Sequence, residues 1–121
     1  PSKKHTFSVS ERIGMVEGSL KGLTNAKVDT YSGLLVDYLK VKKAGILIRG
    51  LRVVSDMDYE FQLASMNRRL YNKVETVFLM PDERYTYLSS SVVKEVAGLG
   101  ASVDDFVSPA VSRLLRAKFK K

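Results

Sequence analysis

The sequence predicts an α/β fold, in which a parallel sheet carries helices on both faces. Short runs of β-forming apolar residues alternate with longer amphipathic segments, which is the pattern of a parallel sheet. Two of these runs, 46–48 and 76–80, are nearly continuously apolar, as strands covered on both faces are. The 121 residues are the size of one domain and contain no linker, repeat or low-complexity segment. We therefore expect a single domain over residues 1–121.

The first half of the chain is expected to form two helices and two strands after an N-terminal loop. Ser8 and Glu11 have the spacing of a capping box at the start of the first helix, and Gly22 is the expected stop. Ser32 is the expected cap of the second helix, which is predicted to end near Gly45. The two strands are predicted over residues 27–30 and 46–49.

The second half is expected to add three helices and one strand. Ser55 and Asp58 resemble a capping box that begins a helix reaching about Leu70. Pro81 ends the strand predicted over 76–80, because proline cannot donate to a sheet ladder. Ser108 is followed by a proline suited to the first helical position. The remaining predictions are a loop over 82–87 and helices over 92–99 and from 109 to the end.

Composition excludes several kinds of site. Cysteine is absent, so disulfides and thiolate metal sites are excluded, and this fits a cytoplasmic protein. His5 is the one histidine, so neither a histidine-based triad nor a multi-histidine metal site can form. No apolar run approaches the roughly 20 residues that cross a membrane. The net charge is +7, but the basic residues are scattered and the sequence has no nucleic-acid-binding signature. We therefore expect no nucleic-acid partner.

Two arginines at the carboxyl end of a strand are the first candidate site. Arg49 and Arg52 flank Gly50 directly after the strand at 46–49. Open α/β sheets bind ligands at the carboxyl ends of their strands. The guanidinium fork matches phosphate oxygens, and glycine lets a ligand approach the backbone closely. The sequence therefore predicts a phosphate-rich ligand at this strand end.

Three consecutive serines, Ser89, Ser90 and Ser91, are the second candidate site. They precede a predicted helix, whose free N–H groups and dipole favour an anion. One serine suffices as an N-cap, so three exceed what capping requires. Together with the two arginines they suggest a polyphosphate held between two loops. Several apolar residues are expected to be core rather than ligand wall: Leu34, Leu35, Phe61, Leu63 and Met66.

Several long motifs occur in a fixed order, and together they resemble the bacterial phosphopantetheine adenylyltransferases over essentially the whole chain. The motifs are Arg49-Gly50-Leu51-Arg52, Ser55-Asp56-x-x-Tyr59-Glu60, Met66-Asn67-Arg68, Glu75–Leu79 and Ser89-Ser90-Ser91-x-Val93-Lys94-Glu95. The resemblance implies a Rossmann-like fold of the nucleotidyltransferase superfamily. It also implies adenylyl transfer from ATP to 4′-phosphopantetheine, which gives dephospho-coenzyme A and pyrophosphate in coenzyme A biosynthesis.

The resemblance also assigns roles to individual residues. Lys3 and Arg49 are implied to face the phosphate of 4′-phosphopantetheine and the reacting α-phosphate, as the catalytic pair. The residues implied to bind the acceptor are Lys3, Leu35, Arg49, Asn67 and Glu95. The residues implied to bind ATP are Gly50, Leu51, Arg52, Glu60, Tyr85, Thr86, Tyr87, Leu88, Ser89, Ser90 and Ser91. The family binds Mg²⁺ with ATP and assembles as a homohexamer, a dimer of trimers; no protein-held metal and no membrane contact are expected.

The chain departs from the family at its start. Family members begin with a strand, a G-x-F-D-P-x-x-x-G-H segment, a helix and a second strand, and none of these precedes Pro1. We therefore expect these residues to be the C-terminal three quarters of the family domain, and to be inactive alone. The alternatives are a non-catalytic module that binds nucleotide or coenzyme A, a nucleic-acid-binding domain, and a transferase acting on nicotinamide mononucleotide or cytidylyl-transfer substrates.

Overall fold

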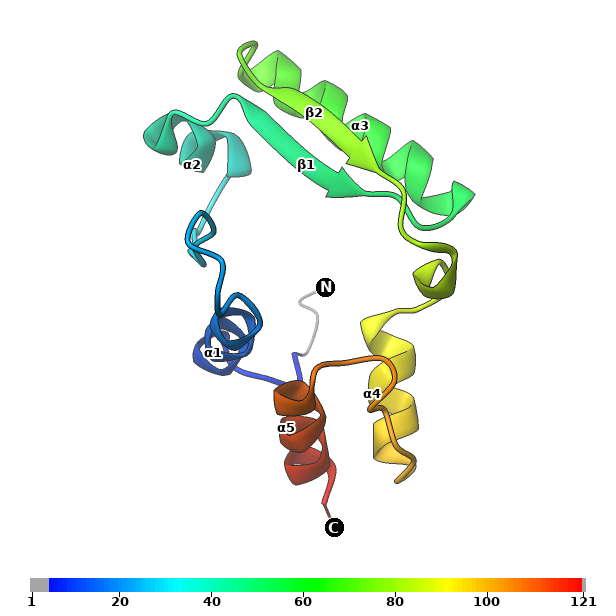
Figure 1. Ribbon diagram of the computed structural model, residues 1–121. Coiled ribbons are helices and arrows are strands. Elements are labelled where there is room, and N and C mark those ends of the chain that lie inside the picture. Colours follow the sequence, from blue (N-terminus) through cyan, green and yellow to red (C-terminus); the bar gives the residue numbers. More distant parts are fainter. Residues whose placement is uncertain (1–4, 121) are drawn as a thin grey trace. The chain divides into compact units, whose positions relative to one another are not determined.

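The computed structural model describes residues 5–120 and divides into two compact units (Figure 1). Tyr31–Leu88 forms the first, which contains both strands and is called the sheet unit below. Pro1–Thr30 and Ser89–Lys121 form the second, which is called the helical unit. The predicted α/β class with a parallel sheet is confirmed.

Strands β1 (Ile46–Gly50) and β2 (Glu75–Leu79) form the sheet. They pair in parallel, and helix α3 (Val54–Leu70) makes the crossover between them, as a parallel connection requires. Both strands lie within one residue of their predicted bounds. The strand predicted over 27–30 was wrong: no sheet hydrogen bonds pair it within the part of the chain that the structure describes, and the sheet there has two strands. An isolated β-forming run without a neighbouring strand leaves its backbone groups to turns and water.

Both helix starts in the sheet unit differ from the prediction. Helix α2 (Leu35–Lys42) begins after Leu34, so Ser32 does not cap it. Its last turn is closed by Lys43 in the left-handed conformation, at φ 54°, rather than by Gly45. Helix α3 begins after Val53, and Ser55 therefore lies inside its first turn. In place of the predicted cap, the Asp56 carboxylate accepts a hydrogen bond from the Arg52 backbone N–H, four residues earlier, at 3.3 Å.

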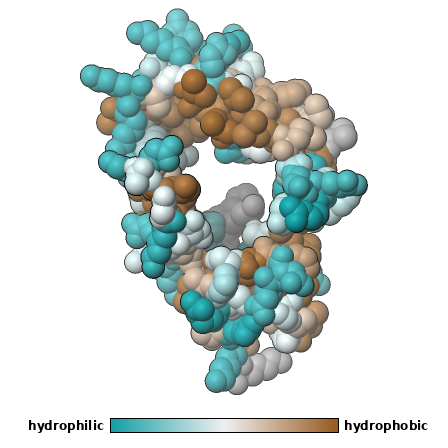
Figure 2. Space-filling model, in the orientation of Figure 1, coloured by the Kyte–Doolittle hydropathy of each residue, from teal (hydrophilic) through white to brown (hydrophobic). Residues whose placement is uncertain are grey.

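The two faces of the sheet differ in burial. On one face, Arg49 and Phe78 are half-buried, and the Phe78 ring meets that of Phe61 edge-on with centroids 5.2 Å apart. Burial alternates along both strands, so they do not have the double coverage that their apolar runs predicted. Figure 2 shows the apolar side chains gathered over β1 and β2. The exposed face carries Ile46, Ile48, Val77 and Leu79.

The helical unit contains α1 (Val9–Ser19), α4 (Ser90–Gly98) and α5 (Pro109–Phe119). The Ser8 capping box is confirmed, since Ser8 and Glu11 exchange hydrogen bonds of 2.7 and 3.1 Å. Helix α4 begins two residues earlier than predicted, whereas α5 begins at Pro109 as predicted. Helix α5 contacts both α1 and α4. The buried residues of this unit are Val93, Val103, Ser112 and Leu115.

None of the helices described, over residues 5–120, has the length and apolar character needed to span a membrane.

Candidate functional site

A cavity of about 270 Å³ lies in the sheet unit, on the helix-covered face of the sheet. The start of α2, the inward residues of both strands and one face of α3 form its wall. Its polar groups are a guanidinium, a carboxylate, an amide, a phenol and a hydroxyl, and the rest of the wall is apolar. The lining residues are Tyr31, Gly33, Leu34, Leu35, Leu47, Arg49, Glu60, Leu63, Ala64, Asn67 and Thr76.

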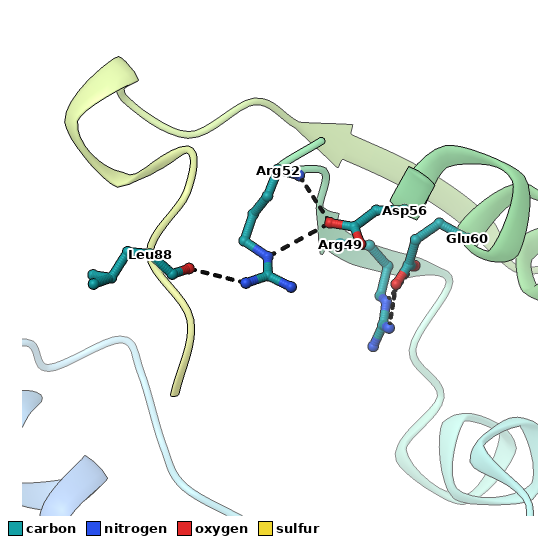
Figure 3. Close-up of polar contacts among 5 residues, drawn as sticks. All are labelled: Arg49, Arg52, Asp56, Glu60 and Leu88. Atoms are coloured by element: carbon teal, nitrogen blue, oxygen red, sulfur yellow. Dashed lines mark hydrogen bonds and ion pairs between the residues drawn. The ribbon is translucent and has the colours of Figure 1, made fainter. Parts of the chain in front are cut away.

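Arg49 and Glu60 form a two-point ion pair in this cavity (Figure 3). Arg49 Nε donates to Glu60 Oε2 at 2.8 Å, and Arg49 Nη2 donates to Oε1 at 2.7 Å. Only 11% of the Glu60 side chain is exposed, against 41% of that of Arg49. The hydrogen bonds from Arg49 lower the pKa of the Glu60 carboxyl, and those to Glu60 raise the pKa of the guanidinium. Both groups therefore stay charged across the physiological pH range.

Arg52 is held differently, by one carboxylate and one carbonyl. Its Nε lies 3.5 Å from Asp56 Oδ2, and its Nη1 donates to the Leu88 carbonyl oxygen at 2.9 Å. Asp56 precedes Glu60 by four residues, so the two carboxylates lie on one face of α3. Figure 3 shows this helix presenting one carboxylate to each strand-end arginine. The chain that leaves the strand is thereby tied to α3 at two successive turns.

The two residues between the arginines have contrasting surroundings. An added Cβ at Gly50 would meet nothing within 4 Å, which leaves the backbone open to a ligand. Leu51 is buried, and its N–H donates to the Leu79 carbonyl at 3.0 Å, so it anchors the strand end in the core.

The predicted loop over 82–87 contains a short 3-10 helix, η1 (Glu83–Tyr85). Asp82 caps it and pairs with Arg84, whose hydrogen bond lowers the pKa of the Asp82 carboxyl. Tyr87 is 86% exposed. Arg52 contacts this segment at its end, through Leu88. The predicted ATP segment therefore meets the predicted phosphate-binding arginine inside the sheet unit. Tyr85 and Thr86, which are also predicted to bind ATP, lie in the same loop.

The serine cluster belongs to the helical unit. Ser89 is the N-cap of α4, and its hydroxyl accepts a hydrogen bond from the Val92 N–H at 3.2 Å. Ser90 and Ser91 are exposed, and their hydroxyls make no hydrogen bond to the residues that the structure describes. Glu95 is also exposed, one turn further along α4. One serine is thus explained by capping and two are not.

Of the remaining predicted site residues, two line the cavity and one lies outside the described part of the chain. Leu35 and Asn67 line the cavity beside Arg49, and Lys3 lies outside the described residues. The expectation that a set of apolar residues forms core was wrong in two ways. Leu34, Leu35 and Leu63 line the cavity, whereas Phe61 and Met66 are 46% and 53% exposed.

Sequence reasoning missed three contributors to this site: Tyr31, Asp56 and Thr76. Tyr31 stacks on Tyr38 with ring centroids 5.1 Å apart and lines the cavity from the segment before α2. The spacing of Asp56, four residues after Arg52 and four before Glu60, was the available signal for its role. Thr76 was assigned to a strand, and its inward direction depends on a register that the sequence does not specify.

Within residues 5–120 no three acidic, histidine or cysteine side chains cluster in a way that could hold a metal ion. The Arg49 guanidinium is paired with Glu60 and keeps N–H donors that Glu60 does not take. A fixed guanidinium beside amide, hydroxyl and apolar groups can hold the phosphate end of an elongated molecule, while a second arginine lies at the same strand end.

Residues 1–96 match the family model described as cytidylyltransferase-like, which includes the whole sheet unit and the serine cluster.

Proposed function

The chain belongs to the cytidylyltransferase-like family of nucleotidyltransferases, and from that premise we propose that its natural protein transfers the adenylyl group of ATP to 4′-phosphopantetheine. The products are dephospho-coenzyme A and pyrophosphate. Nucleotidyl transfer follows from the family; the choice of nucleotide and acceptor is the proposal. We further propose that the protein acts in the cytoplasm, in coenzyme A biosynthesis, and assembles as a homohexamer. Dephospho-coenzyme A and coenzyme A are proposed as further ligands.

The observation that carries the proposal is the cavity beside Arg49. An acceptor with a phosphate at one end and an amide-rich apolar arm needs a cation next to apolar and amide-binding groups. Arg49 supplies the cation, Leu35 lies at the start of α2, and Asn67 offers an amide from α3. We assign the acceptor phosphate to Arg49, together with Lys3, and the arm to Leu35 and Asn67. Glu95 is proposed to reach the same acceptor.

The ATP side is supported by the second arginine. Arg52 is 47% exposed and already donates to a backbone carbonyl of the 82–88 segment, so its donors are within reach of a ligand between the two. We assign the triphosphate to Arg52, to the open backbone at Gly50 and Leu51, to the residues from Tyr85 to Leu88, and to the three serines. The hydroxyls of Ser90 and Ser91 are proposed to lie nearest the departing pyrophosphate.

The proposed reaction is a direct in-line displacement. A phosphate oxygen of the acceptor forms a bond to the α-phosphorus of ATP, and the bond from that phosphorus to the bridging β-oxygen breaks. Pyrophosphate leaves with the electron pair. The attacking oxygen is already anionic, so neither a strong base nor a covalent enzyme intermediate is needed. The task of the protein is to bring two mutually repelling anions together and to stabilise charge on the α-phosphate, for which fixed guanidinium groups suit.

Mg²⁺ is expected to accompany ATP, but the described residues do not fit a protein-held metal. No acidic cluster of the required kind occurs among them, and the Asp56 and Glu60 carboxylates are engaged by arginines. The ion commonly binds through substrate phosphates and water. It would then neutralise phosphate charge without a ligand from residues 5–120.

A panel of acceptors tests the proposal. The natural protein is incubated with ATP and 4′-phosphopantetheine, with ATP and nicotinamide mononucleotide, or with CTP and cytidylyl acceptors, and products are measured by pyrophosphate release and mass spectrometry. We expect dephospho-coenzyme A from the first mixture and little product from the others. Preferential turnover of another acceptor would overturn the assignment. Tight ATP binding without any turnover would favour the non-catalytic binding module instead.

A further inference from the structure

We propose that Glu60 is a positioning residue, which fixes the direction of the Arg49 guanidinium in the cavity. This inference rests on the proposed function, because it concerns how the site orients a phosphate. Its starting point is that both Glu60 carboxylate oxygens already accept hydrogen bonds from Arg49, at 2.8 and 2.7 Å. The carboxylate therefore holds the guanidinium at two points.

The geometry of the pair leaves one edge of Arg49 for a ligand. Arginine has five N–H donors in a rigid plane. Glu60 takes Nε–H and one N–H of Nη2, so Nη1 and the remaining Nη2 proton point away from the carboxylate. Since the fork is planar, fixing one edge fixes the direction of the other. Glu60 therefore determines where the free donors of Arg49 meet a phosphate.

Stability alone does not explain a carboxylate at this position. Burying a charge is costly, and a buried ion pair adds little net stability compared with apolar packing of the same volume. Glu60 is nevertheless buried on a face of α3 that packs against the sheet. A leucine or methionine there would suit the helix and the packing equally well. What only a carboxylate supplies is two-point control of a neighbouring guanidinium.

The matching contact of Arg52 is looser. Its Nε lies 3.5 Å from Asp56, and both side chains are more exposed than Glu60 is. Arg49 is thus the fixed arginine of the strand end and Arg52 the adjustable one. A reacting centre needs a fixed donor because small misplacements reduce the rate strongly, whereas the outer phosphates of a nucleotide can be followed by a mobile side chain.

The charge of the pair leads to an unusual expectation. Arg49 and Glu60 are together neutral, so Glu60 weakens the attraction of the cavity for an anion while it fixes the guanidinium. Removing the carboxylate charge should strengthen ground-state binding of a phosphate and weaken its orientation. We therefore expect Glu60→Gln to lower kcat about 10²-fold, while KM for 4′-phosphopantetheine stays unchanged or falls. A structural defect would raise KM or reduce the amount of folded protein instead.

Steady-state kinetics on the natural protein test this expectation. Glu60→Gln is compared with Glu60→Asp, which keeps the carboxylate but shortens its reach by one methylene, and with Glu75→Gln as a matched control. Glu75 pairs with Arg68 on the surface, where the two side chains are 64% and 58% exposed. We expect wild-type kinetics for the control and an intermediate kcat for Glu60→Asp. A raised KM with unchanged kcat in Glu60→Gln would overturn the inference, as would equal effects in the control.

A double variant separates action through Arg49 from independent action. If Glu60 acts by positioning Arg49, Glu60→Gln should cost nothing further in kcat once Arg49→Gln has removed the guanidinium. Multiplicative losses in the double variant would mean that Glu60 contacts substrate on its own, which contradicts the proposal.

A spectroscopic measurement keeps this inference apart from the proposed function. Side-chain ¹H–¹⁵N spectra of the natural protein are recorded during titration with pyrophosphate. A distinct Arg49 Nε–H resonance that shifts with pyrophosphate in wild type and in Glu75→Gln, but loses its position and response in Glu60→Gln, supports positioning even if no acceptor is turned over. An identical response in Glu60→Gln overturns positioning, even if 4′-phosphopantetheine proves to be the substrate.

Discussion

The sheet unit and the helical unit each contain an arginine that contacts a carboxylate through two hydrogen bonds, and the two pairs differ in what surrounds them. Arg49 and Glu60 lie in a cavity, with Glu60 nearly buried. Arg116 and Asp104 are 60% and 54% exposed, and Asp104 also accepts a hydrogen bond from the buried Ser112 hydroxyl. That hydroxyl is the main cause of the lowered pKa of the Asp104 carboxyl.

The difference teaches that the same pair chemistry has two uses. The Asp104 contacts with Ser112 and Arg116 tie the loop before α5 to that helix. This is sufficient to explain the pair as local structure. The Glu60 contacts join a strand end to a helix beside a cavity that both residues line, and they leave other N–H donors of Arg49 unused by Glu60. The first pair should therefore matter for stability and the second for catalysis.

The largest expected difference between the two pairs is in turnover, when the arginine of each pair is replaced in turn. Arg49→Gln removes the cavity charge but leaves a donor for Glu60, and we expect turnover to fall by about 10²–10³-fold, as for loss of one preorganised donor. Arg116→Gln should leave turnover unchanged and lower the melting temperature slightly, because exposed pairs contribute little. Steady-state rates and thermal unfolding of both variants check this. Equal losses of turnover would remove the distinction between the pairs.

Arg52→Ala should produce the next largest effect, on nucleotide affinity. The loss of a charge-assisted phosphate contact is expected to weaken ATP binding by roughly 1.5–3 kcal/mol. Folding should survive, since Arg52 makes an exposed contact and does not cap α3. Calorimetric titration of the folded variant with ATP measures the change. Unchanged ATP affinity would refute the proposed role of Arg52.

A smaller effect is expected in the helical unit from the two serines that capping does not explain. Replacing Ser90 and Ser91 with alanine should reduce transition-state stabilisation by about 1 kcal/mol for each lost hydrogen bond. The cap made by Ser89 remains, so the melting temperature should hardly change. Ser89→Ala is the matched variant, and it should cost about 1 kcal/mol of stability. Intact turnover in the double variant would refute the proposed role of Ser90 and Ser91, and a stability cost beside it would make these two serines structural.

The smallest expected effect is a dependence of stability on pH in the acid range. The folded-state pKa of Glu60 is lowered by Arg49 below its ordinary value of 4.5. Its contribution to stability is therefore complete above pH 4.5 and is lost as pH falls through the folded-state value. Urea unfolding between pH 3 and 6 should show a steeper decline for wild type than for Glu60→Gln. Parallel curves would mean that the pair contributes nothing to the folded state.

The sequence predicted several local features correctly and others wrongly. Both strands, the Ser8 capping box and the proline start of α5 depend on neighbouring residues, and they were found. The caps assigned to Ser32 and Ser55 were wrong, because α2 begins after Leu34 and α3 after Val53. A different local bond, from the Arg52 N–H to Asp56, forms at the start of α3.

The site was predicted in part. The strand-end arginines were evident from sequence, since their position relative to a strand is a local property. The cavity was not, because Leu34 and Leu63 have the spacing of core residues and only the packing of α2, α3 and the sheet leaves a space between them. The partnership of Arg49 with Glu60, eleven residues apart, likewise required the fold.

The central claim is that Arg49 recognises a phosphate group in the cavity of the sheet unit. Calorimetric titration of the natural protein and of Arg49→Gln with 4′-phosphopantetheine and with pantetheine, which lacks the phosphate, tests it directly. We predict that Arg49→Gln weakens binding of 4′-phosphopantetheine by roughly 1.5–3 kcal/mol, the range for a hydrogen bond to a charged group, and leaves binding of pantetheine unchanged. An equal loss for both ligands, or no loss for either, would contradict the claim.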